Sequence, residues 1–176
     1  MKSIINSNSD FSIVQEEEFS ISNRALLELL QETLSKGYSL RLRVRGFSMF
    51  PCIRDNDIVT VSPLNGCTSY LGLAVAFIHP HTTKLVIHRV IEQHEDIAII
   101  KGDSVFCIDG LIPLKNILGA VTKLERNNKP MRFGMGIGRT VALFFNKTNV
   151  FSVLFYAGMR FSRVIRQAIN LSSLHE

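Results

Sequence analysis

Little in this chain points to a metal site or to a disulfide framework. Its 176 residues include three cysteines, Cys52, Cys67 and Cys107. They are too few and too widely spaced for a zinc knuckle or a set of disulfides, and their usage is typical of a reducing compartment. The histidines and cysteines also lack the spacing of metal ligands. We therefore expect no metal and no cofactor.

Long apolar runs are missing as well. The longest, "VFSVLFYAGM" at 150–159, has half the length of about 20 residues that a transmembrane helix needs. The N-terminal "MKSIINSNSDFSIVQEEEFS" has three consecutive glutamates where a secretory signal peptide has its apolar core. These absences predict a cytoplasmic protein.

Composition predicts one main domain, since 46% of the residues are hydrophobic and 20% are charged. The net charge is +5, and such a basic balance favours nucleic acid or an anionic membrane surface as a partner. The tail lacks the interleaved aromatic and polar pattern of a base reader, so we expect no nucleic acid. Much of the positive charge follows residue 128: Lys129, Arg132, Arg139, Lys147, Arg160, Arg163 and Arg166.

Three segments follow from the patterns along the chain. Residues 1–37 begin with either a polar arm or an edge strand around "FSIV" and continue with an amphipathic helix from Ser22 to a C-terminal Gly37. Residues 38–127 contain strands, and residues 128–176 form a glycine-rich linker and a helical tail.

The central segment predicts a mainly β fold. Residues 39–46, "SLRLRVRG", alternate core-facing Leu40, Leu42 and Val44 with outward-facing Arg41, Arg43 and Arg45. Further strand-like runs are "DIVTVSP", "LGLAVAFIHP", "TKLVIHRVIEQ", "DIAIIKG" and "NILGAVTKLER". Because no helical segment lies between them, we expect a compact antiparallel or mixed β domain.

The tail is basic and amphipathic. "RTVALFFN" and "VFSVLFYAGMRFSRVIRQAINL" have helical spacing. The second places Phe151, Leu154, Phe155, Met159 and Ile165 on one side and Arg160, Arg163 and Arg166 on the other. Such a tail can pack on the β domain, form a dimer or lie peripherally on a membrane.

Ser48 is the first candidate for chemistry, within "RVRGFSMFPCIRDNDIVTV" at 43–61. Gly46 permits a tight turn and Pro51 prevents a return to the ladder, so Ser48 should lie at a sheet edge with its hydroxyl free. It is either a turn residue or a nucleophile, and a nucleophilic serine needs a base within hydrogen-bond reach.

His88 is the candidate base, because it interrupts the otherwise apolar strand "LVIHRVIE". His79 and His81 flank Pro80 in a turn and His94 lies among glutamates, so we expect those three on the surface. A third group could orient the imidazole. "IIKGDSVFCIDG" offers Asp103 and Asp109, each of which is either a turn residue or that orienting carboxylate.

Together these stretches resemble a known family. "GFSMFPCIRDNDIVTV", "VIHRVIE" and "IIKGDSVFCID" resemble, in order and spacing, three boxes of the signal peptidase I and LexA-type serine peptidase superfamily. The resemblance covers residues 40–124. In bacterial signal peptidases and LexA-type repressors the base is a lysine. With His88 in that position, the chain resembles more closely the endoplasmic-reticulum and archaeal type of signal peptidase.

The resemblance implies a signal-peptidase-like β domain and a role for each matched residue. Ser48 is the expected nucleophile, His88 the general base and Asp109 the orienting carboxylate, with Asp103 as the alternative. The backbone N–H of Ser48 is the expected oxyanion donor. Gly46, Met49 and Pro51 are the expected oxyanion and substrate-binding neighbours.

Two positions and one expected segment depart from the family pattern. Asn56-Asp57 replaces the Gly-Asp after the first box, and asparagine tolerates positive φ. Gly46 stands where the family often has a serine whose hydroxyl helps to bind the oxyanion. An N-terminal membrane anchor is also missing, which again favours the cytoplasm.

Three functions remain open. The first is a serine endopeptidase that cleaves leader or signal-like peptides, bound in extended form along an edge strand and with small side chains near the cut. The second is an inactive peptide-binding module of the same fold. The third, a self-cleaving LexA-like regulator, ranks last because only one helix precedes Arg41 and the base is histidine. The oligomeric state is left open.

Overall fold

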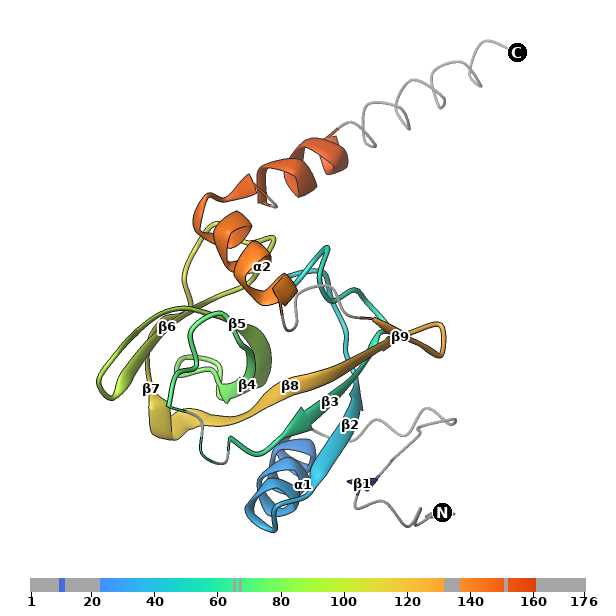
Figure 1. Cartoon of the computed structure of the whole chain (residues 1–176), viewed down its shortest axis with the longest axis vertical. Coiled ribbons are helices and arrows are strands. Elements are labelled where there is room, and N and C mark those ends of the chain that lie inside the picture. Colours follow the sequence, from blue (N-terminus) through green and yellow to red (C-terminus); the bar gives the residue numbers. More distant parts are fainter. Residues whose placement is uncertain are drawn as a thin grey trace.

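A computed structural model of the chain describes residues 10–11, 23–64, 66, 68–131, 137–150 and 152–160. The fold is mainly β, as the sequence predicts: the strands form one nine-stranded sheet in the order β1-β2-β3-β8-β4-β5-β6-β7, with β9 paired to β8 (Figure 1). All neighbours are antiparallel except β1 and β2. The strands are β1 Asp10–Phe11, β2 Ser39–Arg43, β3 Ile58–Ser62, β4 Ala74–Ile78, β5 Leu85–His94, β6 Ile97–Lys101, β7 Gly110–Pro113, β8 Ile117–Arg126 and β9 Lys129–Met131.

The helix α1, Asn23–Ser35, precedes β2 and ends as predicted. Gly37 has a φ of 81°, and its N–H donates to Leu34 O at 3.0 Å while Tyr38 N–H donates to Thr33 O at 3.1 Å. This pair of bonds is a Schellman motif, which satisfies carbonyls at a helix end. Ser22, the expected N-cap, lies outside the described residues.

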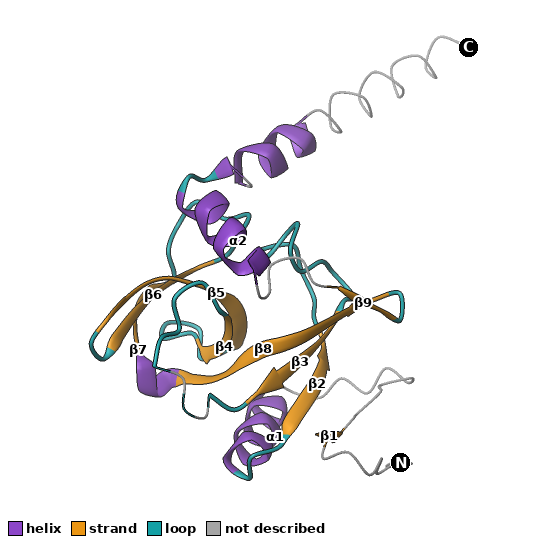
Figure 2. Ribbon diagram, in the orientation of Figure 1, coloured by secondary structure: helices purple, strands orange, loops and turns teal. Residues whose placement is uncertain are grey.

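The alternation predicted for residues 39–46 is confirmed over β2. Leu40 is fully buried and packs with Leu30 and Leu34 of α1. Arg41, on the opposite face, forms a 2.6 Å ion pair with Glu125 of β8. The helix therefore covers one face of the sheet beside β2, β3 and β8 (Figure 2).

Irregular pairing bends the rest of the sheet. The register shifts between β3 and β8 at Thr60/Val61, between β4 and β8 at Ala76/Phe77, and between β5 and β6 at Val90/Glu92. Such bulges bend and twist strands. A second apolar cluster, which includes Phe77 and Ile100, fills the bend formed by β4 to β7.

Five further strands match the predicted runs, whereas two short strands were not predicted. β7 occupies part of the third box, and β9 pairs with β8 within the segment that we expected to be a linker. Both are short and contain a proline, which is typical of sheet edges and gives little periodic signal. A single 3-10 turn, η1 Leu114–Asn116, connects β7 to β8.

The C-terminal segment is helical where it is described. The helix α2, Ile137–Lys147, contains "RTVALFFN", and residues 152–160 are also helical. Four of the predicted tail residues lie outside the described residues: Phe151, Arg163, Ile165 and Arg166. In the described residues, no helix has both the length and the apolar character needed to span a bilayer.

Candidate active site

The turn between β2 and β3 presents Ser48. Gly46 adopts a φ of 99°, which a residue with a side chain rarely does. Its N–H donates to Asp55 Oδ1 at 2.8 Å, and Phe50 N–H donates to Phe47 O at 3.0 Å. A cis peptide bond between Phe50 and Pro51 follows. The two hydrogen bonds hold Ser48 within a closed turn between β2 and β3.

Three of the four predicted catalytic side chains meet at this turn. Ser48 Oγ lies 2.8 Å from His88 Nε2, and His88 Nδ1 lies 2.7 Å from Asp109 Oδ2. An ionised carboxylate only accepts hydrogen bonds, so Nδ1 carries the proton. Nε2 is then left with a lone pair that accepts the Ser48 hydroxyl proton, which is the tautomer a general base requires.

His88 and Asp109 come from neighbouring parts of the sheet. His88 lies in β5 with its side chain mostly buried, and it sits opposite Val75 of β4. Asp109 immediately precedes β7, and its N–H donates to Ile100 O of β6 at 2.9 Å. The side chain of Asp109 is 13% exposed. Pairing of His88 with β4 and the backbone bond from Asp109 to β6 thus fix the base and the carboxylate.

A second histidine reaches the same carboxylate. His79 Nε2 lies 4.0 Å from Asp109 Oδ1, with only 19% of the His79 side chain exposed. Its Nδ1 accepts the N–H groups of His81 and Thr82 at 3.2 and 3.3 Å, so Nε2 carries a proton toward Asp109. We expected His79 on the surface, and that expectation was wrong. The signal that we missed is strand alternation. His79 lies an even number of residues after Val75, so the two side chains point to the same face. Val75 pairs with His88, which puts His79 on the face of His88 as well.

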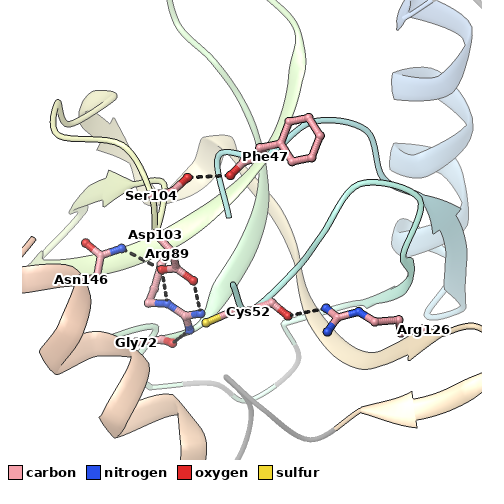
Figure 3. Close-up of polar contacts among 8 residues, drawn as sticks. All are labelled: Phe47, Cys52, Gly72, Arg89, Asp103, Ser104, Arg126 and Asn146. Atoms are coloured by element: carbon pink, nitrogen blue, oxygen red, sulfur yellow. Dashed lines mark hydrogen bonds and ion pairs between the residues drawn. The ribbon is translucent and has the colours of Figure 1, made fainter. Parts of the chain in front are cut away.

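The fourth predicted residue, Asp103, does not join this triad. It is fully buried and accepts two hydrogen bonds from Arg89, Nε to Oδ1 at 2.8 Å and Nη2 to Oδ2 at 2.7 Å (Figure 3). Asn146 Nδ2 of α2 also donates to Oδ1 at 2.8 Å. The geometry therefore leaves Asp109 as the carboxylate that orients His88, and gives Asp103 to a buried ion pair.

Arg89 was not assigned a role from the sequence, although it follows His88 directly. Successive strand residues point to opposite faces, so His88 faces Ser48 while Arg89 faces the buried Asp103. Arg89 Nη1 also donates to Gly72 O at 2.8 Å. Burial lowers the pKa of Arg89, but its hydrogen bonds to Asp103 and the charge of that residue outweigh burial and raise the pKa overall.

Cys52 lies beside this ion pair, with its sulfur next to the guanidinium of Arg89 (Figure 3). Burial raises the pKa of the Cys52 thiol, and the negative charge of Asp103 adds to the effect. The thiol is 1% exposed and is not paired in a disulfide. A buried neutral thiol of this kind is inert, so Cys52 is a packing residue.

The third box also supports the nucleophile turn directly. Ser104 Oγ donates to Phe47 O at 2.6 Å and Ser104 N–H donates to Ser48 O at 2.9 Å. At Gly102, an added Cβ would lie 2.7 Å from Ser48 O and 3.2 Å from His88 Nε2. Only glycine therefore fits between the serine and the histidine without moving them.

Asn56 and Asp57 close the turn on its other side. Asn56 has a φ of 67°, as expected for its position. Asp57 is 2% exposed and accepts hydrogen bonds from Arg54 N–H at 2.7 Å and from Arg126 Nε and Nη2 at 2.9 and 2.7 Å. The hydrogen bonds to Asp57 raise the pKa of Arg126. Arg126, at the end of β8, is a second supporting residue that the sequence did not reveal.

A groove of about 490 Å³ opens beside Ser48 and His88. Its walls are aliphatic, with Leu42, Val44, Met49, Leu85 and Ile87 among them, and Gly46 also lines it. Pro51, which we expected at the substrate, is not among the lining residues. Met49 is 4% exposed, so it forms the base of the groove rather than its rim.

Two strand edges border the groove. β1 pairs with β2 at Ser39 and Leu40 alone, which leaves the outer edge of residues 41–46 unpaired within the described part of the chain. β6 pairs with β5 from Arg89 onward, so residues 85–88 pair with β4 on one side only. Both edges thus offer backbone hydrogen-bonding groups to an added extended segment.

No protein-family model matches the chain, and no curated protein sequence matches it either. Among the residues that the structure describes, no group of three or more His, Cys, Asp or Glu side chains is arranged to hold a metal ion.

Proposed function

We propose that the protein is a serine endopeptidase that cleaves extended leader or signal-like peptides. One observation carries the proposal: Ser48, His88 and Asp109 form a continuous hydrogen-bonded triad at the wall of a groove. A hydroxyl, a base and a group that orients the base are what nucleophilic activation requires.

The reaction follows from the hydrogen bonds. Ser48 Oγ attacks the peptide carbonyl carbon while its proton passes to His88 Nε2, and Asp109 stabilises the resulting imidazolium through Nδ1–H. His88 then gives the proton to the leaving amine, the C–N bond breaks and an acyl-enzyme forms. Water, deprotonated by His88, attacks the ester and releases the acid, which restores Ser48.

The oxyanion of the tetrahedral intermediate needs preorganised donors. The N–H of Ser48 has no acceptor within the described residues, so it is free for this role. Gly46 provides no hydroxyl, and stabilisation therefore comes from backbone donors. We therefore expect this protein to acylate more slowly than an enzyme whose oxyanion hole also contains a side-chain donor.

The groove supports an extended peptide as substrate. The free edges at residues 41–46 and 85–88 can each pair with a peptide backbone, as in strand addition. The aliphatic walls favour apolar side chains near the cut. These features, together with the order of the three boxes, support a place for the chain in the signal peptidase and LexA-type superfamily, on its Ser-His branch.

The test combines peptide cleavage with labelling by an acylating serine probe. We expect the wild-type protein to cleave peptides with apolar residues before the scissile bond and to acylate at Ser48. Ser48→Ala and His88→Ala should abolish both. Ser35→Ala and His81→Ala, which alter an exposed serine and an exposed histidine, are the matched controls and should retain activity.

An inactive binding module gives a different result. If a broad peptide panel stays intact and the folded protein is not acylated at Ser48, the peptidase proposal fails. Peptide binding in the groove that is unchanged by Ser48→Ala would then favour the module.

A further inference from the structure

The groove beside Ser48 carries charge of one sign. Arg43 and Arg45 are among its lining residues, and none of the described residues that line it is an aspartate or a glutamate. Both arginines are exposed. Most of the other lining residues are aliphatic. A ligand of the groove therefore meets apolar surface and positive charge together.

Strand geometry separates these two kinds of surface. Arg43 ends β2, and backbone pairing continues past it, because Val44 N–H donates to Asp57 O at 2.9 Å. Successive side chains of an extended segment point to opposite sides. Leu42 and Val44 pack against the core cluster that contains the leucines of α1, so the two arginines share the other side.

Both arginines lack an acidic partner among the described residues. Arg45 Nη1 donates to the neutral amide oxygen of Asn56 at 2.6 Å, and the side chain of Arg43 forms neither a hydrogen bond nor an ion pair with described residues. Arg41, two residues before Arg43, is instead matched by Glu125 at 2.6 Å. The positive charge of this strand is therefore left unmatched where the strand borders the groove.

Asp55 is a carboxylate of the turn that contains Gly46. Its Oδ1 accepts Gly46 N–H and its Oδ2 accepts Asn56 Nδ2, both at 2.8 Å, so its oxygens are used within the turn. Because Asp55 and Arg45 both bond to Asn56, Asp55 offsets part of the charge of Arg45. Arg43 therefore offers the stronger attraction to an acidic ligand.

We propose that the groove selects extended peptides in which apolar and acidic side chains alternate. In a strand added along residues 41–46, the side chains on one side face Leu42 and Val44, and those on the other side lie beside Arg43 and Arg45. Acidic side chains two residues apart then pair with the two guanidinium groups, as opposite charges do across neighbouring strands. The inference rests on the proposed function, and it makes Arg43 and Arg45 specificity-determining residues for the peptide.

The experiment measures peptide binding by fluorescence anisotropy in the full chain carrying Ser48→Ala, so that no peptide is cut. Three short labelled peptides alternate valine with glutamate, glutamine or lysine. We expect the glutamate peptide to bind about threefold to tenfold more tightly than the glutamine peptide, and the lysine peptide to bind most weakly. Added salt should reduce the difference, because it screens exposed charges.

The matched variants reverse one charge each. Arg43→Glu should lower the ratio of glutamate-peptide to lysine-peptide affinity at least about fivefold, since it replaces attraction by repulsion. Lys115→Glu makes the same change of charge at an exposed position in η1, which does not line the groove, and it should leave the ratio unchanged. Thermal unfolding of each variant verifies its fold.

Three results would overturn the inference: no binding of any of the peptides, equal binding of all three, and an equal fall of the ratio in Arg43→Glu and Lys115→Glu. Failure of the proposed function looks different. A protein that prefers the glutamate peptide but is not acylated at Ser48 keeps the selectivity and loses the peptidase activity. A protein that is acylated and cleaves the three peptides equally keeps the activity and loses the selectivity.

Discussion

Asp103 and Asp109 lie in the same connection between β6 and β7, but their surroundings give them opposite properties. Asp103 is fully buried, and a guanidinium and an amide occupy its oxygens. Asp109 is partly exposed and faces two imidazoles, one in hydrogen-bond contact and one at 4.0 Å. A permanent charge on Arg89 fixes Asp103 in one role. In the proposed reaction His88 takes up and gives back a proton, so Asp109, which is hydrogen-bonded to it, would take part in the chemistry.

The largest effect that tests this difference is expected from Asp109→Asn. Loss of the carboxylate removes the group that fixes the His88 tautomer, so we expect kcat to fall by about 10²–10⁴-fold. The melting temperature should stay close to that of the wild type, because the side chain is partly solvated. Peptide hydrolysis and thermal unfolding measure the two quantities. A fall in stability with kcat preserved would mean that Asp109 is structural.

Asp103→Asn should show the reverse behaviour. Leaving Arg89 buried without its counter-ion should lower the free energy of unfolding by about 3–5 kcal/mol, as measured by urea denaturation. Activity per folded molecule should change little. The double variant Arg89→Met/Asp103→Leu is the control, and it should recover most of the stability because it removes both charges together. If the single variant keeps full stability, the ion pair is not what holds this connection.

His79→Gln sharpens the comparison on the side of Asp109. At 4.0 Å the two groups are too far apart for a hydrogen bond, and even a weak ion pair would contribute only on the order of 0.2–1 kcal/mol. We therefore expect kcat/KM to fall less than about fivefold. A loss as large as that of Asp109→Asn would give His79 a direct part in the reaction.

The smallest effect concerns thiol labelling, which reports on the surroundings of Asp103. Cys107 is exposed, whereas Cys52 is buried and the pKa of its thiol is raised by burial. Iodoacetamide at neutral pH should thus modify Cys107 and leave Cys52 intact, as judged by mass spectrometry of each cysteine. In Asp103→Asn the labelling of Cys52 should increase, because the weakened ion pair lets this region open. Equal labelling in both proteins would contradict a link between the two residues.

The sequence predicts those helices, strands and turns that depend on local patterns of residues. The helix before β2, the alternation of β2 and the strand containing His88 follow from the spacing of apolar residues, and the geometry around Ser48 follows from Gly46 and Pro51. The choice between Asp103 and Asp109 could not be made in this way. It depends on which side of an irregular connection each carboxylate faces, and no short-range pattern encodes that.

The remaining surprises arise from long-range pairing. Arg89 with Asp103 and Arg126 with Asp57 are ion pairs between distant segments, and only the assembled sheet brings them together. The turn around Pro80 led us to expect His79 on the surface. Its alternation with Val75 along the strand in fact places it beside the site. β7 and β9 are too short for a periodic signal, so their pairing partners define them.

Gly102 offers a practical way to separate recognition from reaction. A methyl group at this position would press on the backbone of Ser48 and on the ring of His88, and so would force the two apart while deleting neither. The groove and its strand edges would be left in place. On the proposed peptidase function, alanine at residue 102 would thus give a variant that binds its peptide without cutting it, and the peptide it retains from a cell extract would identify the substrate.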